Sequence, residues 1–299
     1  MRILLTGKTG QVGHYLQQFL APLGELIAPD HAQMDLSRND SIVAAIRDTK
    51  PDIIVNAAGT TDVDRAEREP DSTMQIDGIA PGLMAEEARG CGALLVHYST
   101  TFVFNGTASE PYDEEDPVDP INAYGSSKLY GERAIAATGC HHLILRATWT
   151  YSDRRSNFPL ALFKLARERK ELAIVDDQVG APTWARAYAK TTAELLKHPM
   201  RARERSGIYH LSSGGQTTRY LWAAKIIELA QKYTRNTAGW PNLRPIASSE
   251  YPHGGPRPLY TIIDNSKIHA TFGIRMSGWD KQLETFIREW AARSPVYAG

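Results

Sequence analysis

The chain is poor in cysteine and in long apolar runs. Cys91 and Cys140 are too few for a disulfide framework in 299 residues, and we interpret both as small buried or half-buried side chains. No apolar run approaches the roughly 18 residues that a membrane-spanning helix needs. The first apolar run ends at Gly7 and is too short for the core of a secretory signal. We therefore expect a cytoplasmic protein without a membrane partner.

The chain also lacks an excess of charge of either sign. Its 34 Lys and Arg residues balance 34 Asp and Glu residues. A neutral protein has no overall field that attracts nucleic acid or an anionic membrane, so neither is expected as a partner. Any anionic ligand must instead be held by local donors. No set of His, Cys and carboxylate residues has the spacing of metal ligands, so no catalytic metal is expected.

Short apolar runs alternate with amphipathic stretches through the first half of the chain. The apolar runs predict buried strands at residues 2–6, 25–28, 52–55, 93–98 and 142–146. The amphipathic stretches predict helices at residues 12–23, 41–48, 73–89 and from residue 122 onward. Near-continuous apolar strands separated by helices are typical of a parallel sheet that helices cover on both faces. The sequence therefore predicts a doubly wound α/β fold of the Rossmann type.

The alternation ends after residue 150, where a polar stretch begins. We predict that residues 1–150 form a dinucleotide-binding domain, to which the chain returns near residues 184–212. Residues 151–299 are predicted to form mainly a smaller substrate-binding lobe. Within that lobe, residues 234–258 are rich in Pro, Gly and Ser, and this composition predicts a long loop.

Three glycines lie between the first predicted strand and the first predicted helix. Gly7 permits a sharp turn, Gly10 lets the backbone approach a pyrophosphate, and Gly13 lets helix and strand pack closely. The free N–H groups of Gln11 and Val12, at the positive end of the helix, can bind phosphate oxygens. This placement of the glycines predicts a site for a dinucleotide.

A carboxylate follows the second predicted strand. Asp30 lies about 20 residues after the glycine turn, where an acidic side chain commonly accepts the ribose hydroxyls, although a simple surface position is the alternative. Such a carboxylate favours NAD because it repels a 2′-phosphate. Lys8, His31 and Arg38 can neutralise that phosphate, so both NAD and NADP remain candidate cofactors.

Two further pairs of residues are candidate cofactor contacts. Asp35 and Leu36 suit a contact with adenine, with helix capping by Asp35 as the alternative. Ala57 and Ala58 follow the third predicted strand, and their small side chains let a cofactor lie against the backbone. This position agrees with the rule that ligands bind beyond the carboxyl ends of parallel strands.

The candidate catalytic residues are a tyrosine and a lysine in one helical pattern. Tyr124 and Lys128 are four residues apart, which places both on one helix face with their Cβ atoms about 5–6 Å apart. The ammonium stabilises a phenolate and is expected to lower the tyrosine pKa, so the pair can donate a proton to a carbonyl oxygen. The hydroxyls of Ser99 and Thr100 follow the fourth strand and are expected at the same crevice. An exposed helix face and ordinary strand-end turns are the alternatives.

These residues belong to a longer set of landmarks that resembles the extended short-chain dehydrogenase/reductases. Within them, the set is similar to the branch that reduces a dTDP-linked 4-keto sugar. The landmarks comprise the glycine turn and the following residues: Val55, Asn56, Val63, Asp64, Arg65, Ala66, Glu67, Tyr98, Ser99, Thr100, Asn122, Tyr124, Lys128, Arg146, Trp149, Asn157, Asp177, Gln178, Gly180, Pro182, Thr183, Gly207, His210, Arg257 and Pro258.

The resemblance implies reduction of the C4 ketone of dTDP-4-dehydro-L-rhamnose by NADPH or NADH. It implies that Tyr124 donates the proton, Lys128 supports it, Thr100 is the third catalytic residue, and the tyrosine and lysine also contact the cofactor. Further implied cofactor contacts are Gly59, Thr60 and Thr61. Implied substrate contacts are Thr100, Thr101, Trp149, Gln178 and Arg257. The oligomeric state is left open, with a homodimer as one outcome.

The chain departs from the pattern of this branch at four positions. Thr101 replaces a usual Asp, Phe102 a common Tyr, Asp77 a usual Asn and Ala147 a frequent Ser. The change at Thr101 removes an acceptor for sugar hydroxyls. Two alternatives therefore stay open: a reductase or epimerase of another nucleotide-activated 4-keto sugar, and a non-catalytic dinucleotide-binding regulatory subunit.

Overall fold

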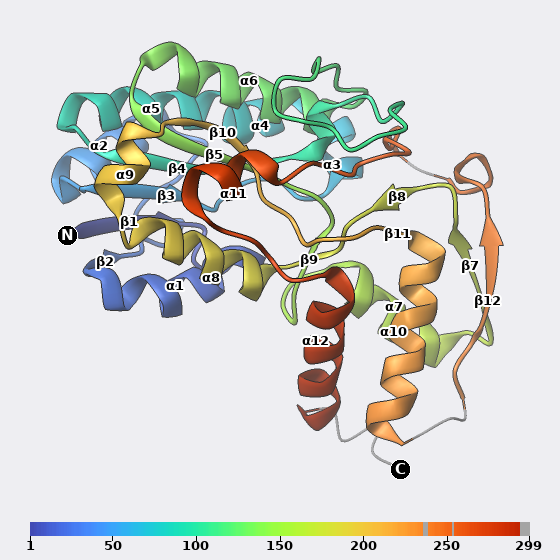
Figure 1. Ribbon diagram of the computed structural model, residues 1–299. Coiled ribbons are helices and arrows are strands. Elements are labelled where there is room, and N and C mark those ends of the chain that lie inside the picture. Colours follow the sequence, from blue (N-terminus) through green and yellow to red (C-terminus); the bar gives the residue numbers. More distant parts are fainter. Residues whose placement is uncertain (236–238, 253, 294–299) are drawn as a thin grey trace.

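A six-stranded parallel sheet forms the centre of the larger part of the molecule (Figure 1). The computed structural model describes residues 1–235, 239–252 and 254–293. The strand order is β10-β5-β4-β3-β1-β2, so the chain starts inside the sheet and builds outward in both directions. The strands are β1 (Arg2–Thr6), β2 (Glu25–Ile27), β3 (Ile53–Asn56), β4 (Leu94–Thr100), β5 (His141–Ala147) and β10 (Gly207–His210).

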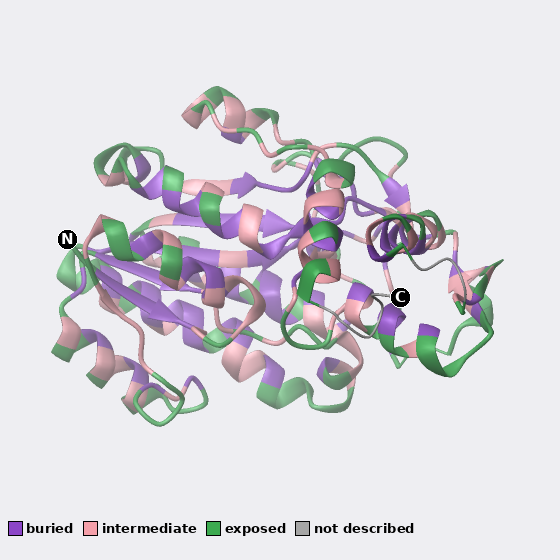
Figure 2. Cartoon of the chain, turned by 90° about the horizontal axis from the view of Figure 1, so that it is seen from below, coloured by how far each residue is buried: buried purple, intermediate pink, exposed green. Residues whose placement is uncertain are grey.

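Helices cover both faces of this sheet. Side chains alternate along each strand, so Ile3 and Leu5 of β1 enter one apolar core while Leu4 enters the other. Figure 2 shows the buried strands lying between the helical layers. The first core is covered by α1 (Gln11–Leu20), α8 (Ala185–Leu196) and α11 (Ser266–Phe272). The second core is covered by α2 (Asn39–Thr49), α5 (Ala80–Cys91) and α6 (Ala123–Thr138). The predicted doubly wound α/β fold is confirmed.

The helix predicted at residues 73–89 is interrupted. The short helices α3 (Val63–Arg68) and α4 (Pro70–Thr73) lead into a π-helical turn, Met74–Ile79, and only then does α5 begin. Apolar periodicity does not distinguish a π-helical turn from α-helix over so few residues. Turns of this kind are frequent at functional sites because they redirect the side chains that they carry.

A second, smaller apolar core lies beside the sheet (Figure 1). Trp222 of one helix, Phe163 of another and Phe286 of a third are buried in it. The helices of this part are α7 (Phe158–Glu168), α10 (Arg219–Thr234) and α12 (Trp279–Arg293). The short helix α9 (Pro199–Glu204) belongs instead to the large sheet, where it packs near β5 and buries Ala202 in the first core. Its short strands are β6 (Thr150–Tyr151), β7 (Glu171–Val175), β8 (Val179–Gly180), β9 (Thr183–Trp184), β11 (Thr217–Thr218) and β12 (Asn242–Ile246). The domain boundary at residue 150 stays a prediction.

The long loop predicted at residues 234–258 contains a strand. β12 pairs in parallel with β7, in a register that places Asn242 opposite Glu171 and Pro245 opposite Ile174. A two-stranded sheet leaves both strands with a free edge, where a proline is tolerated because one side of the strand has no partner. The prediction of a continuous loop from composition is therefore wrong for Asn242–Ile246. Residues 236–238 and 253 lie outside the described part of the chain.

No helix in the described ranges is both long and apolar enough to cross a membrane.

A buried ion pair anchors α6 to the sheet. Arg146 of β5 donates from Nε to Glu132 Oε1 over 2.9 Å and from Nη2 to Glu132 Oε2 over 2.6 Å. Both side chains are 2% exposed, and Ser99 of β4 also donates to the carboxylate. A forked guanidinium–carboxylate contact fixes orientation as well as distance. The contact therefore sets how α6 lies against the ends of β4 and β5.

Loss of the Glu132 charge should destabilise the whole fold. Glu132→Gln leaves the buried Arg146 cation without a counter-ion, and we expect the free energy of unfolding to fall by about 3–5 kcal/mol. Urea unfolding measures the change. Glu228→Gln, which removes the carboxylate of an exposed pair with Lys225, is the control and should have little effect. Equal losses in both variants would contradict the anchoring role.

Candidate active site

The predicted site residues follow strands that end at one edge of the sheet. Thr6 pairs with Asn56, Asn56 with His97, and Thr100 with Ala147, so the carboxyl ends of β1, β3, β4 and β5 lie side by side. Loops that leave these ends meet at a common crevice, which is where ligands bind in open α/β sheets. The glycine turn, the alanine pair and the hydroxyl of Thr100 are therefore brought together as predicted.

The glycine turn has the shape of a phosphate cradle. Gly7 has a φ of 70°, and a side-chain carbon there would lie 2.5 Å from the carbonyl oxygen of Ala57. A side-chain carbon at Gly13 would lie 2.0 Å from the carbonyl oxygen of Gly7. Gly10 caps α1 without a side chain, so the first N–H groups of the helix, including those of Gln11 and Val12, stay available to oxygen atoms of a ligand. This geometry fits the pyrophosphate of a dinucleotide.

A polar hollow that was not predicted lies beside this turn. Thr9, Asp153, Arg154 and Arg155 line it. Arg155 donates to the Thr9 hydroxyl over 2.9 Å and to the Thr9 carbonyl over 3.2 Å. Two guanidinium groups therefore lie close to the cradle, on a segment whose polar composition was the only sequence signal.

The residues proposed for the adenosine end make local contacts. Asp30 is exposed, and its carboxylate accepts the N–H of Gln33 over 3.0 Å. Asp35 accepts hydrogen bonds from both the hydroxyl and the N–H of Ser37, and these bonds hold the pKa of its carboxyl below the usual range. Leu36 is 8% exposed and belongs to the second sheet core. Turn formation thus accounts for Asp35, and the cofactor roles of these residues stay predictions.

The loop after β3 connects the cofactor side of the crevice with the catalytic side. Ala57 and Ala58 are half-buried beside the glycine turn. A side-chain carbon at Gly59 would lie 2.6 Å from Asp77 Oδ1 and 2.8 Å from Lys128 Nζ. Of the two predicted neighbours, Thr60 is half-buried and Thr61 is exposed. The backbone at Gly59 therefore passes directly over the charged groups of the site.

The predicted catalytic tyrosine and lysine lie on the first turns of α6. Asn122 caps this helix by accepting the N–H of Gly125 over 2.7 Å. Tyr124 is half-buried, and the Thr100 side chain is close enough to lower the pKa of its phenol. Lys128 is 5% exposed, and its Nζ lies 3.4 Å from the carbonyl oxygen of Tyr98. The structure thus brings together the three residues expected to carry the chemistry.

Asp77 is a functional residue that the sequence did not identify. Its carboxylate is fully buried, lies 3.2 Å from Lys128 Nζ and accepts the N–H of Thr60 over 3.0 Å. Gly131 of α6 makes the approach possible, because a side-chain carbon there would lie 2.3 Å from the carbonyl oxygen of Asp77. The aspartate was visible only as a departure from the family pattern. Its partner depends on the π-helical turn and on the packing of α6.

Burial favours the protonated form of Tyr124. Burial raises the Tyr124 pKa, Lys128 lowers it, Asp77 raises it and Thr100 lowers it, with a net rise. The expectation that the Tyr124 pKa is lowered is therefore wrong. Lys128 does lower this pKa, but burial raises it by more. Burial lowers the Lys128 pKa, but the negative charge of Asp77 and the interaction with Tyr124 raise it by more, so the net shift is upward. At neutral pH the site thus holds a protonated phenol beside an ammonium, which suits a proton donor.

The five predicted substrate residues differ in their surroundings. Thr101 is fully buried, and its hydroxyl has no hydrogen-bond partner within the described ranges. Trp149 adopts a left-handed backbone with a φ of 45° just beyond β5. Gln178 donates to the Ser248 hydroxyl over 3.1 Å, and Arg257 donates to Asp64 over 2.6 Å. Thr100 lies beside Tyr124, and all five substrate roles stay predictions.

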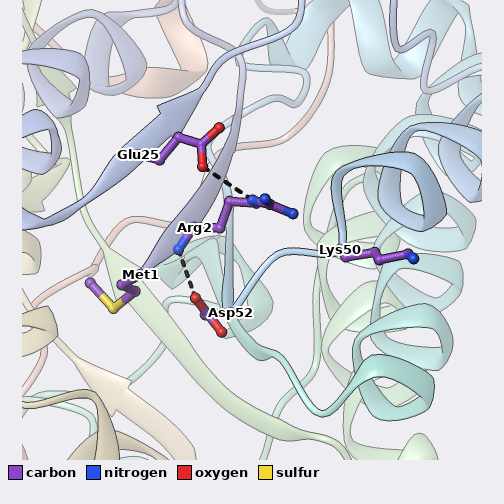
Figure 3. A pocket seen from close by; sticks show the side chains of 5 residues that line it. All are labelled: Met1, Arg2, Glu25, Lys50 and Asp52. Atoms are coloured by element: carbon purple, nitrogen blue, oxygen red, sulfur yellow. Dashed lines mark hydrogen bonds and ion pairs between the residues drawn. The ribbon is translucent and has the colours of Figure 1, made fainter.

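A second hollow lies at the opposite edge of the sheet (Figure 3). Arg2 donates from its side chain to Glu25 over 3.1 Å and from its backbone to Asp52 over 2.7 Å. The amino ends of β1, β2 and β3 surround this hollow, whereas ligands in such sheets bind at the carboxyl ends. Its charges are also largely paired. It is therefore not the candidate active site.

A phosphate cradle on the first βα turn, and a phenol beside a buried ammonium on the same sheet edge, define a dinucleotide-dependent oxidoreductase of the extended short-chain dehydrogenase/reductase class. The chain belongs to the family described as RmlD substrate binding domain, whose model matches residues 1–292. The resemblance seen in the sequence is thereby confirmed.

Several relatives of the chain have the same name. The chain is 41% identical to a dTDP-4-dehydrorhamnose reductase of Burkholderia thailandensis, over 97% of this chain and 99% of that protein. It is 38% identical to a protein of the same name from Escherichia coli K12, over 97% and 98% of the two chains. The crystal structure of a dTDP-4-dehydrorhamnose reductase from Bacillus anthracis in complex with NADP is similar, with a TM-score of 0.87, 30% identity and coverage of 96% and 99%.

A methyl group at Gly10 should weaken dinucleotide binding without unfolding the protein. A side-chain carbon at Gly10 has its nearest neighbour, the carbonyl oxygen of Gly7, at 3.1 Å, so that carbonyl must shift by only a few tenths of an ångström, whereas at Gly7 and Gly13 the added carbon would overlap the backbone. The same carbon would lie where the pyrophosphate must approach. We expect the Kd of NADPH for Gly10→Ala to rise about tenfold or more, as measured by fluorescence titration.

Gly90→Ala is the matched control, because no atom lies within 4 Å of a carbon added there. Unchanged affinity in Gly10→Ala would show that the cradle does not hold the dinucleotide.

Removal of the Asp77 charge should move the alkaline limb of the pH profile. Asp77 raises the Tyr124 pKa, so Asp77→Asn lowers it, and a proton donor loses activity once the pH exceeds its pKa. We expect the alkaline limb of kcat/KM to move to lower pH by about one unit. Asp40→Asn, at a surface pair with Arg38, is the control. A limb that stays in place or moves to higher pH would contradict the electrostatic role of Asp77.

Proposed function

We propose that this protein reduces the C4 ketone of dTDP-4-dehydro-L-rhamnose to dTDP-L-rhamnose with NADPH or NADH. The observation that carries the proposal is the half-buried Tyr124, held between Thr100 and the buried Lys128 at the cofactor edge of the sheet. The names of the relatives support the substrate, and the NADP complex of a relative supports the cofactor. A regulatory subunit without activity has no need for a protonated phenol beside a buried ammonium.

The residues of this chain supply the proton and the surroundings of the reaction. The reduced nicotinamide, when bound, supplies the hydride that the ketone carbon accepts. Tyr124 donates its phenol proton to the ketone oxygen, which completes the alcohol and leaves a phenolate. Lys128 stabilises that phenolate by its adjacent positive charge, and Asp77 holds the ammonium in place. A proton from solvent then restores the phenol.

The residues present fit either form of the dinucleotide. Gly7, Gly10 and Gly13 would hold its pyrophosphate, and Ala57 and Gly59 would lie against its nicotinamide half. Near the ribose position, the cations that could accept a 2′-phosphate already have partners. Arg38 pairs with Asp40, His31 lies 3.4 Å from Asp35, and Lys8 donates to a backbone carbonyl. These contacts are at the surface and easily exchanged, so we propose no strong preference for NADPH or NADH.

The sequence also suggested a cytoplasmic location and a homodimer. Both stay predictions, and sedimentation of the purified protein would decide the second.

The proposal is tested by turnover. Purified protein, NADPH and dTDP-4-dehydro-L-rhamnose should give loss of absorbance of the reduced cofactor and a product identified as dTDP-L-rhamnose by NMR. Tyr124→Phe should lower kcat/KM by about 10²–10⁴-fold, since the proton donor is lost. Tyr130→Phe is the control, because Tyr130 lies on the same helix and is 51% exposed.

Two results would reject the proposal. Absence of turnover with either cofactor would exclude this substrate, and an epimerised sugar formed without net cofactor consumption would indicate an epimerase instead.

A further inference from the structure

Arg219 lies over an aromatic platform in the smaller part of the molecule. It is the first residue of α10, and its guanidinium carbon lies 3.7 Å from the ring centre of Trp149. The same carbon lies 5.3 Å from the ring centre of Phe158 and 5.7 Å from that of Trp222. Stacking of this kind holds the planar guanidinium in one orientation without using its hydrogen-bond donors.

The guanidinium of Arg219 has no anionic partner within the described ranges. No carboxylate of the described residues lies within ion-pair distance of it, whereas Arg146, Arg186 and Arg257 each have one. Arg203 is also half-buried without an ion pair, but its guanidinium donates to the carbonyl oxygen of Asp52 over 3.0 Å. Arg257 pairs with Asp64 at 2.6 Å, and Arg146 pairs with Glu132 at 2.6 Å. Arg186 gives the closest comparison, because it lies 4.0 Å over the ring of Trp184 and is also paired with Glu289. Arg219 has the aromatic platform alone.

The electrostatic surroundings of Arg219 are unfavourable to its charge. Burial and the nearby Arg257 lower its pKa to about 9, so it stays a cation at neutral pH at an energetic cost. Of these two neighbouring guanidinium groups only Arg257 is paired with a carboxylate, Asp64, so together they carry a net positive charge. Buried or half-buried charges are normally paired, so an uncompensated one indicates that its partner comes from a ligand.

Arg219 also lies among the residues expected to bind the substrate. Its backbone N–H donates to the carbonyl oxygen of Gln178 over 3.3 Å. Trp149, on which Arg219 stacks, also packs against Gly180, since a side-chain carbon at Gly180 would be 2.4 Å from the indole. Trp149 in turn follows Ala147, which pairs with Thr100 at the catalytic edge. Arg219 is therefore stacked on a residue that lies two positions beyond the carboxyl end of β5, the strand that pairs with Thr100.

We propose that Arg219 binds the diphosphate of the nucleotide-sugar substrate, with Arg257 as the second cation. The assignment of the anion as a substrate diphosphate rests on the proposed function. A guanidinium group binds phosphate oxygens through two parallel N–H donors, and its planar fork is matched to that geometry. Arg257 is already neutralised in part by Asp64, so Arg219 supplies most of the free positive charge. A neutral chain thus obtains a local site for a ligand with two or more negative charges.

The pyrophosphate of the cofactor has the same chemistry, so the experiment must separate the two sources. Isothermal titration calorimetry with dTDP and, separately, with NADPH is carried out on the wild type and on two variants. Arg219→Met keeps an unbranched apolar stem over Trp149, and Arg219→Gln keeps a polar tip. For both we expect the Kd of dTDP to rise about 10–100-fold and that of NADPH to change less than about twofold.

Steady-state kinetics gives a second readout. KM for the nucleotide sugar should rise by a similar factor while kcat changes little, because Arg219 does not contact the reacting atoms. Arg219→Lys should recover only part of the dTDP affinity, since it keeps the charge and loses the fork. Arg186→Gln is the matched control: it removes a guanidinium stacked on an indole that already has a carboxylate partner. It should leave dTDP affinity unchanged.

The possible results separate this inference from the proposed function. Circular dichroism shows which of the two variants, Arg219→Met and Arg219→Gln, is folded. If a folded variant binds dTDP with unchanged affinity, the role of Arg219 is overturned. Weakened binding of NADPH with unchanged binding of dTDP also overturns it, because the guanidinium would then serve the cofactor. If the wild type fails to reduce dTDP-4-dehydro-L-rhamnose but the variants lose dTDP affinity, the proposed substrate is wrong and the nucleoside-diphosphate site stands.

Discussion

The buried ion pair between Asp77 and Lys128 is the contact on which the rest of the site depends. It joins the π-helical turn to α6, and the backbone at Gly59 passes directly over it. One contact thus fixes the distance between the cofactor loop and the catalytic helix. A buried ammonium is costly without a counter-ion, and the carboxylate keeps it charged. The same carboxylate favours the protonated form of Tyr124, which is the form that a reduction requires.

Charge is distributed unevenly along the crevice. Around Lys128 and Arg146, each cation faces a buried carboxylate; the first pair holds α6 against the π-helical turn and the second holds it against the sheet. Farther along, Arg219 lies on Trp149 without a carboxylate partner in the described part of the chain. Paired cations stabilise the framework, whereas an unpaired one is available to a ligand. The chain has no net charge, so this local imbalance is what can attract a diphosphate.

The parts of the fold that depend on local pattern could be predicted from the sequence. The first five strands of the large sheet, the glycine turn and the placement of Tyr124 and Lys128 on one helix follow from apolar alternation, backbone freedom and helical spacing, whereas β10 was not predicted as a strand. Asp77 and Arg219 could not be identified in this way, because their surroundings come from distant segments. Asp77 meets Lys128 only because Gly131 lets α6 approach, and β12 forms only because β7 offers an edge. Such contacts depend on packing, which residue spacing does not record.

The central claim is that hydride reaches the ketone carbon while Tyr124 protonates the oxygen. The most direct measurement uses NADPH deuterated at the nicotinamide C4, with dTDP-4-dehydro-L-rhamnose as substrate and NMR of the product. The account predicts one deuterium at C4 of dTDP-L-rhamnose for each cofactor oxidised. A product without deuterium at C4, or a changed sugar formed while the cofactor stays reduced, would contradict it.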